Sequence, residues 1–250
     1  FERNTTTGNW REVQKIVASD RAGGDQFGSS VSISGNYAIV GARLEDEDAS
    51  GQNTINRAGS AYIFERNSTT GTWSEVQKIV ASDRDDVDQF GNSVSISGNY
   101  AIVGAPYEDE DASGQDSLNA AGSAYLFERN ASGTWSEVQK IVASDRAKDD
   151  YFGWSVSISG DNAIVGARFE DEDASGQNTK SSAGSAYLFE RNATTGTWSE
   201  AQKIVASDRD ANDYFGGSVS ISGNYAVVGA PNEDEDASGN NYKDGAGSAY

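Results

Sequence analysis

The sequence predicts an all-β fold, a β-propeller of four-stranded antiparallel blades with about 62 residues in each blade. The dipeptide Phe-Gly recurs at spacings of 63, 62 and 63 residues, at Phe27, Phe90, Phe152 and Phe215. Each period contains four short apolar or alternating segments separated by turn residues, and none has a helical period. We therefore expect residues 1–250 to form a single propeller domain, or a segment of one, with four blades' worth of sequence.

The first two strands of a blade are read from the period that begins at Phe27. In "SVSISG", Val31 and Ile33 alternate with serines, which predicts a strand, and the following Gly35-Asn36 predicts a two-residue hairpin turn. "YAIVGA" (Tyr37–Ala42) is almost entirely apolar, as expected of a strand buried on both faces. The side chains that we expect in the core, with their equivalents in the other periods, are Val31, Ile33, Ile39 and Val40.

The third and fourth strands follow after an acidic loop. "GSAYIFER" (59–66) and "TWSEVQKIVA" (72–81) predict these strands, joined by the turn "NSTTG". The third period lacks one residue in this turn, which places the turn at an exposed hairpin tip. Glycines in "FG" and "VGA" allow neighbouring backbones to approach closely near the axis. A β-sandwich is the alternative, but sandwiches do not repeat so regularly.

Composition excludes several classes of function. The chain has 39 acidic and 19 basic residues and a net charge of −20, which argues against binding to nucleic acids or anionic membranes. No apolar run approaches the roughly 20 residues of a membrane span, so we expect no membrane insertion. The absence of Cys and His excludes thiol nucleophiles and Ser-His dyads. Catalysis by carboxylates, as in glycoside hydrolysis, is the one common form of catalysis that the composition still allows.

The repeated phrases resemble a known family. "FGNSVSISGNYAIVGAP" (90–106), "FGGSVSISGNYAVVGAP" (215–231) and "GSAYIFER" are similar to the FG-GAP repeat, the blade of the integrin alpha-subunit propeller and of its bacterial relatives. The resemblance covers the whole chain. It implies a propeller, an extracellular or cell-surface location, bound calcium and a role in adhesion.

Two features depart from that family pattern. Blades one and three read "GAR" where the pattern has "GAP", at Arg43 and Arg168. The calcium loop of integrins falls between the first two strands, where this chain has only a short turn. The cation-site positions of integrins are therefore not carried over to this chain.

The acidic phrase "EDEDASGQ" after the second strand is the candidate metal site. Asp46, Asp48 and Ser50 alternate and are followed by Gly51, which is the D-x-D-x-S-G opening of an EF-hand-like calcium loop. On this interpretation Glu45 and Glu47 point away from the ion. The same set recurs in the other periods as Asp109, Asp111 and Ser113; Asp171, Asp173 and Ser175; and Asp234, Asp236 and Ser238. The bidentate Glu at position 12 and the flanking helices of an EF-hand are absent, and the alternative is a solvated acidic loop.

Topology favours calcium over a merely solvated loop. In an up-and-down blade, the loop between strands two and three lies on the same face as the loop that joins one blade to the next. The joining loops are also acidic, for example at Asp20 and Asp25. The two loops together would repel each other strongly without cations.

The opposite face carries four N-x-S/T sequons on the predicted hairpin tips, at Asn4, Asn67, Asn130 and Asn192. These are possible glycosylation sites. Asn, Ser, Thr and Gly are also good turn formers, and we favour that explanation of the pattern.

Three functions fit these observations. The first is a non-enzymatic, extracellular calcium-binding propeller for adhesion, protein interaction or structural assembly, with a protein or glycan ligand. The second is a calcium-dependent lectin, in which Trp and Tyr stack on sugar rings. The third is a glycosidase, which we disfavour because every acid recurs in each period whereas an enzyme needs one asymmetric site. The repeating Trp residues are expected in the blade core, and Trp154, which replaces Ser29, Asn92 and Gly217 of the other periods, near the axis.

Overall fold

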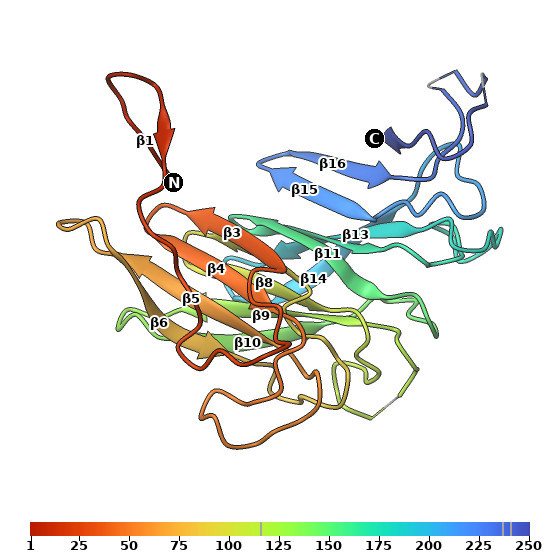
Figure 1. Ribbon diagram of the computed structural model, residues 1–250. Helices are drawn as coiled ribbons and strands as arrows, with labels where there is room; N and C mark the ends of the chain where they lie inside the picture. Colours follow the sequence, from red (N-terminus) through yellow and green to blue (C-terminus); the bar gives the residue numbers. More distant parts are fainter. Residues whose placement is uncertain (116, 237, 241) are drawn as a thin grey trace.

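The computed structural model describes residues 1–115, 117–236, 238–240 and 242–250. In this part of the chain the strands form four successive antiparallel sheets, arranged as propeller blades, and one short two-stranded pair, with no helix. The described residues thus include no helix long and apolar enough to cross a membrane. Figure 1 shows the sheets following one another through the molecule in chain order. The predicted all-β propeller is confirmed.

The strands of each blade are consecutive in sequence and adjacent in the sheet. Blade one consists of β3 (Ser30–Ser34), β4 (Tyr37–Ala42), β5 (Ser60–Arg66) and β6 (Trp73–Ile79). Blade two consists of β7 (Ser93–Ser97), β8 (Tyr100–Ala105), β9 (Ser123–Arg129) and β10 (Trp135–Ile141). Blade three consists of β11 (Phe152–Ser159), β12 (Asn162–Ala167), β13 (Ser185–Arg191) and β14 (Trp198–Ile204). Blade four contains β15 (Ser218–Ser222), β16 (Tyr225–Ala230) and β17 (Ser248–Ala249). Near the N-terminus, β1 (Glu2–Arg3) pairs with β2 (Trp10–Arg11) as a separate two-stranded sheet.

The hairpin between the first two strands has the predicted geometry. Ser34 lies opposite Tyr37, so that Gly35 and Asn36 alone form the turn. Gly35 has a φ of +58°, a left-handed conformation that glycine adopts without the steric cost of a side chain.

The hydrophobic core lies between consecutive blades. Ile39 and Ile63 of blade one pack in one cluster with Val94 and Tyr125 of blade two. Equivalent clusters fill the interfaces between blades two and three and between blades three and four. Trp135 and Trp198 are each 2% exposed, so the tryptophans that begin β10 and β14 belong to the core, as predicted. The equivalent Trp10 on β2 is 67% exposed, so the prediction is wrong for that residue.

Glycines bring the backbones of neighbouring blades into direct contact. A Cβ on Gly104 would lie 2.0 Å from the carbonyl oxygen of Gly153 in the next blade. The equivalent Gly41 and Gly166 approach the next blade in the same way. The predicted role of these glycines is confirmed.

The alternating serines of the innermost strands also join the blades. The N–H of Ile96 on β7 donates to Ser32 Oγ on β3 at 3.2 Å, and that of Ile158 on β11 donates to Ser95 Oγ at 3.1 Å. These serines therefore satisfy backbone donors of the following blade, where an apolar side chain would leave the donors unpaired.

Two expectations for the terminal blades are wrong. Val31 and Ile33 are 68% and 65% exposed, whereas the equivalent Val94 and Ile96 are 6% and 4% exposed. The difference arises because, in the described part of the chain, no sheet covers that face of blade one. Blade four has three described strands in place of the four that we predicted, and because no described sheet follows it, Val227 on β16 is 49% exposed whereas its equivalent Ile39 is buried.

Replacing Gly104 by Ala tests the close approach between blades. We expect Gly104→Ala to lower the free energy of unfolding by about 3 kcal/mol, because the new methyl group meets rigid backbone. In a chain of this size this corresponds to a fall in melting temperature of roughly 6 to 12 °C. Gly23→Ala is the matched control, since an added Cβ there meets nothing within 4 Å. Equal melting temperatures for the two variants would contradict the contact.

Candidate functional site

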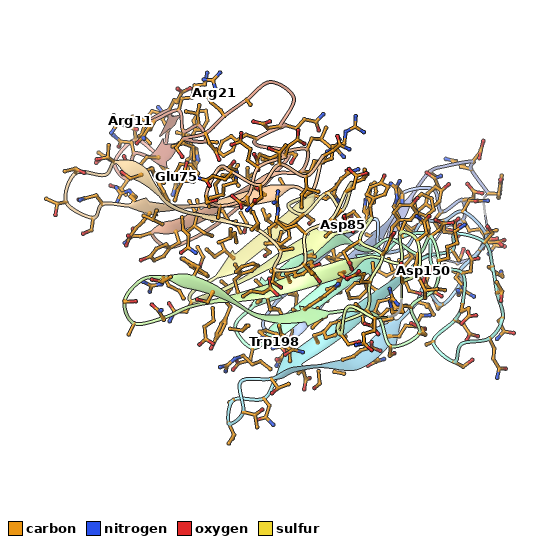
Figure 2. The ribbon with its side chains drawn as sticks, turned by 90° about the horizontal axis from the view of Figure 1, so that it is seen from below. Arg11, Arg21, Glu75, Asp85, Asp150 and Trp198 are labelled. Carbon is orange, nitrogen blue, oxygen red and sulfur yellow. The ribbon has the colours of Figure 1, made fainter. Side chains whose placement is uncertain are left out.

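The acidic loops and the loops that join the blades lie at the same end of the sheets, which we call the acidic face. Figure 2 shows Asp85 and Asp150, from two joining loops, toward this end and Trp198, where β14 begins, toward the opposite end. Oxygen atoms of Asp20, Glu45 and Glu47 lie within 4.8 Å of one another. The predicted crowding of the two kinds of loop is therefore confirmed.

A buried lysine lies at the centre of this crowding. Lys78 Nζ on β6 is 2.7 Å from Asp20 Oδ2 of the joining loop and 2.7 Å from Glu45 Oε2 of the acidic loop. Ser60 Oγ donates to the same Glu45 oxygen at 2.6 Å, and Tyr62 OH donates to Asp20 Oδ1 at 2.8 Å. We call these five side chains the lysine cluster of blade one.

The lysine cluster recurs in blades two and three. Lys140 contacts Asp83 and Glu108 at 2.8 and 2.9 Å, and Lys203 contacts Asp145 and Glu170 at 2.7 and 2.9 Å. In blade four, Ser248 donates to Glu233 and Tyr250 donates to Asp208, both at 2.6 Å. One arrangement thus fixes the acidic loop of each blade to its third strand.

Burial and charge set the protonation of these groups. Burial by itself acts to lower the pKa of Lys140, but hydrogen bonds and charges from Asp83 and Glu108 outweigh it and raise the pKa. The lysine therefore stays charged. Burial raises the pKa of Asp88 to about 7, with a further contribution from the negative charge of Glu108. Asp150 has a pKa of about 7 for the same reasons. These two carboxyls form no ion pair with the described residues, and a pKa of about 7 leaves each of them partly protonated near neutral pH.

The residues predicted as calcium ligands make hydrogen bonds within their own loop. Asp48 Oδ1 accepts from the N–H and the hydroxyl of Ser50 at 2.8 and 2.6 Å, and Asp46 Oδ1 accepts from the N–H of Arg57 at 2.6 Å. The hydroxyl of Ser50 contributes most to holding the pKa of Asp48 far below its usual range. These contacts repeat at Asp109, Asp111 and Ser113; Asp171, Asp173 and Ser175; and Asp234, Asp236 and Ser238. Their assignment as ligands stays a prediction.

Three other groups of carboxylates can hold a metal ion. They are Asp20, Glu45 and Glu47; Asp83, Glu108 and Glu110; and Asp145, Glu170 and Glu172. Oxygen ligands of this kind suit Ca²⁺ and Mg²⁺ alike. In each group the lysine ammonium already lies against two of the three carboxylates, so a metal ion there would compete with it.

Sequence reasoning missed the lysine cluster. It gave Glu45 no structural role and placed its side chain away from the ion, yet Glu45 is only 4% exposed and contacts Lys78. A usable signal was present, because "QK" recurs in the fourth strand of each period, with the lysine at Lys15, Lys78, Lys140 and Lys203. A lysine repeated in a strand next to buried side chains requires a repeated carboxylate partner.

The sequons lie on turns at the opposite end from the acidic face. Asn67 Oδ1 accepts the N–H groups of Thr69 and Thr70 at 2.9 and 3.0 Å, within the hairpin that joins β5 and β6. Asn4, Asn130 and Asn192 make equivalent bonds. The hairpin position is confirmed, and these bonds account for asparagine as a turn former; glycosylation stays a prediction.

We expect Lys140→Met to destabilise the protein by about 3 to 5 kcal/mol, because it leaves Asp83 and Glu108 without their cation. Lys148→Met is the matched control, since the Lys148 side chain is 65% exposed and, among the described residues, pairs with the exposed Asp149. Urea unfolding measures both variants. Adding Glu108→Gln to Lys140→Met should recover part of the loss, and equal stabilities of the two single variants would show that the cluster contributes nothing.

The repeat found in the structure matches a known family model. The model of the FG-GAP repeat matches the chain four times, over residues 10–64, 73–127, 135–189 and 198–250. No curated protein matches the chain. Sqt1 of Saccharomyces cerevisiae has a similar solved structure, with a TM-score of 0.43 and 9% identity over 75% of this chain and 38% of that one.

A protein from Lactobacillus plantarum is similar at a TM-score of 0.41 and 14% identity, over 72% of this chain and 41% of that one. The chain spans about two fifths of the length of these two proteins. The family matches cover most of the chain, and each contains one period of the repeated strands. The chain therefore belongs to the FG-GAP repeat family.

Proposed function

We propose that the chain is a non-enzymatic β-propeller that binds calcium on its acidic face and serves in protein interaction outside the cell, in adhesion or structural assembly. One observation carries the proposal. Each complete lysine cluster gathers more carboxylates than ammonium groups: Asp83, Glu108 and Glu110 adjoin the single Lys140. A divalent cation in the neighbouring acidic loop would neutralise the excess at each repeat.

Membership of the repeat family and the fixed loops support a role in interaction. A series of blades held by backbone contacts presents a rigid surface of repeated loops, which suits recognition of a large partner. The carboxylates also recur in equivalent structural positions, as expected for binding and stability. The resemblance of the repeats to those of integrin alpha subunits supports an extracellular location and a role in adhesion.

The lectin alternative finds less support. Trp135 and Trp198 are 2% exposed and are unavailable for stacking on sugar rings, and the exposed Trp10 lies on β2 beside the Asn4 hairpin, at the opposite end from the acidic loops. The half-buried Trp154 has the guanidinium of Arg168 against its ring, at 3.4 Å from Cζ to the ring centroid. A glycan array with and without calcium tests this alternative directly.

We expect calcium to raise the melting temperature. A site at ten times its dissociation constant adds about 1.4 kcal/mol, and several independent sites add several kcal/mol. For a chain of this size each kcal/mol raises the melting temperature by roughly 2 to 4 °C. The measurement compares melting curves in calcium, in magnesium and in chelator at equal ionic strength. The proposal fails if the three curves coincide.

A second prediction assigns the ligands. We expect the quadruple variant Asp48→Asn, Asp111→Asn, Asp173→Asn and Asp236→Asn to lose the calcium-induced rise in melting temperature. Asparagine still accepts the N–H of the loop serine, so the loop keeps its shape while the ligand loses its charge. The change is made in every repeat because intact sites would hide the loss of one.

The matched control is Glu47→Gln, Glu110→Gln, Glu172→Gln and Glu235→Gln, which removes the same number of charges. We expect it to keep most of the calcium response, because in the groups that contain Glu47, Glu110 and Glu172 a lysine ammonium already lies against the other two carboxylates and would compete with an ion there. A larger loss in the glutamate variant would assign the ion to those groups instead. Equal losses would indicate diffuse counterions and no defined ligands.

A further inference from the structure

One cluster on the acidic face breaks the repeat. Five aromatic side chains, from β11 and from the loops of blades two, three and four, pack around Arg168, and most of their ring contacts are edge to face. We call them the aromatic cluster: Tyr107, Tyr151, Trp154, Phe169 and Tyr214. All five are half-buried, so the cluster has an exposed surface.

The cluster exists only where these blades meet, because the same positions differ elsewhere. Trp154 is replaced by Ser29, Asn92 and Gly217, and Tyr151 by Gln26 and Gln89 in the first two blades. The fold forms without these aromatic residues in blade one, where Gln26 and Ser29 take the places of Tyr151 and Trp154. Their presence in blade three therefore calls for an explanation beyond blade architecture.

Arg168 lies flat on one wall of the cluster. Its Cζ is 3.4 Å from the ring centroid of Trp154 and 4.4 Å from that of Phe169, and these two rings are inclined at 82°. A guanidinium comes this close to a ring centroid only by stacking face to face, so the N–H donors of Arg168 point along the indole surface.

The Arg168 side chain makes no hydrogen bond or ion pair with the residues that the structure describes, and its Nε is a buried donor without a partner. The titratable groups nearest to it are the phenols of Tyr107, Tyr151 and Tyr214. The chain has 39 acidic residues and only 19 basic ones, yet Arg168 pairs with none of the described carboxylates. The guanidinium is therefore available to a carboxylate from another molecule.

Blade one provides the comparison. Arg43 occupies the equivalent position, and its Nε donates to Gln26 Oε1 at 2.9 Å. In blade three Tyr151 replaces that glutamine, so the change that adds an aromatic ring also removes the internal partner of the arginine. The two arginines differ in having, or lacking, a satisfied Nε.

We propose that Arg168 and the aromatic cluster bind a carboxylate carried next to an apolar side chain on a partner protein. Because Nε is buried, the two Nη groups of the guanidinium present the paired donors that match the two carboxylate oxygens, and the ring edges of Tyr107 and Phe169 contact the apolar group. A peptide fits better than an acidic polysaccharide, since the face of Trp154 is already covered and a net charge of −20 repels a polyanion. The inference rests on the proposed role in protein interaction and names the group that is recognised.

The test uses two small probes, N-acetyl-L-phenylalanine and N-acetyl-L-phenylalaninamide. The first carries a free carboxylate, and in the second a neutral amide replaces it. The indole N–H signal of Trp154 is followed by NMR and assigned with Trp154→Phe, and the other four tryptophans serve as internal controls. We expect a saturable shift with the acid and at least about tenfold weaker binding of the amide, because the charged pair is lost. This comparison uses the unaltered protein.

Variants locate the effect. Arg168→Gln should abolish binding of the acid, and Arg168→Lys should weaken it several-fold because the planar fork is lost while the charge remains. Arg43→Gln should bind as the unaltered protein does. Melting curves confirm that each variant is folded.

Any of four results would overturn the inference: equal binding of acid and amide, binding unaffected by Arg168→Gln, tighter binding of methyl glucuronide than of the acid probe, or no saturable shift up to roughly tens of millimolar probe. The titrations are run in calcium and in chelator. A missing calcium effect on stability would contradict the proposed function alone, whereas a missing probe effect would contradict this inference alone.

Discussion

A lysine ammonium buried between two carboxylates joins three separate segments of each complete blade. Lys78 on β6 contacts Asp20 of the joining loop and Glu45 of the acidic loop. Removing one of these charges leaves another buried without a partner, at a cost of several kcal/mol. The two loops therefore cannot move independently of the outer strand. Whatever the acidic face binds meets a surface that is already formed.

The interfaces between blades give that surface its regular spacing. Glycines such as Gly104 let one backbone touch the next, and serines such as Ser32 accept N–H groups from the following blade. Both contacts involve the main chain, so they hold neighbouring sheets at a separation that side-chain volume alone does not set. The lysine clusters thus repeat along the acidic face in nearly the same geometry, with contacts that agree within about 0.2 Å in blades one, two and three.

The repeated lysine clusters and the single aromatic cluster have different roles on the acidic face. The lysine clusters recur because each blade needs the same attachment between loop and strand. The aromatic cluster does not recur: Trp154 and Tyr151 replace small or polar residues, and Arg168 loses the partner that Arg43 keeps. A repeat fold tolerates such replacements because each blade contacts only its neighbours, so one interface can change without disturbing the others. Recognition of a single partner requires a local difference of this kind.

The sequence by itself determined the repeat, the order of the strands and the meeting of the two acidic loops. Periodicity, turn residues and alternation are local signals, and the topology of an up-and-down blade then places Asp20 and Glu45 at one end. Only the tertiary structure decided which neighbouring carboxylate turns inward, because that depends on Lys78, which lies 33 residues further along the chain than Glu45. Burial was likewise decided by neighbours: the same "SVSIS" is exposed at Val31 and buried at Val94, since only the second has a blade against it.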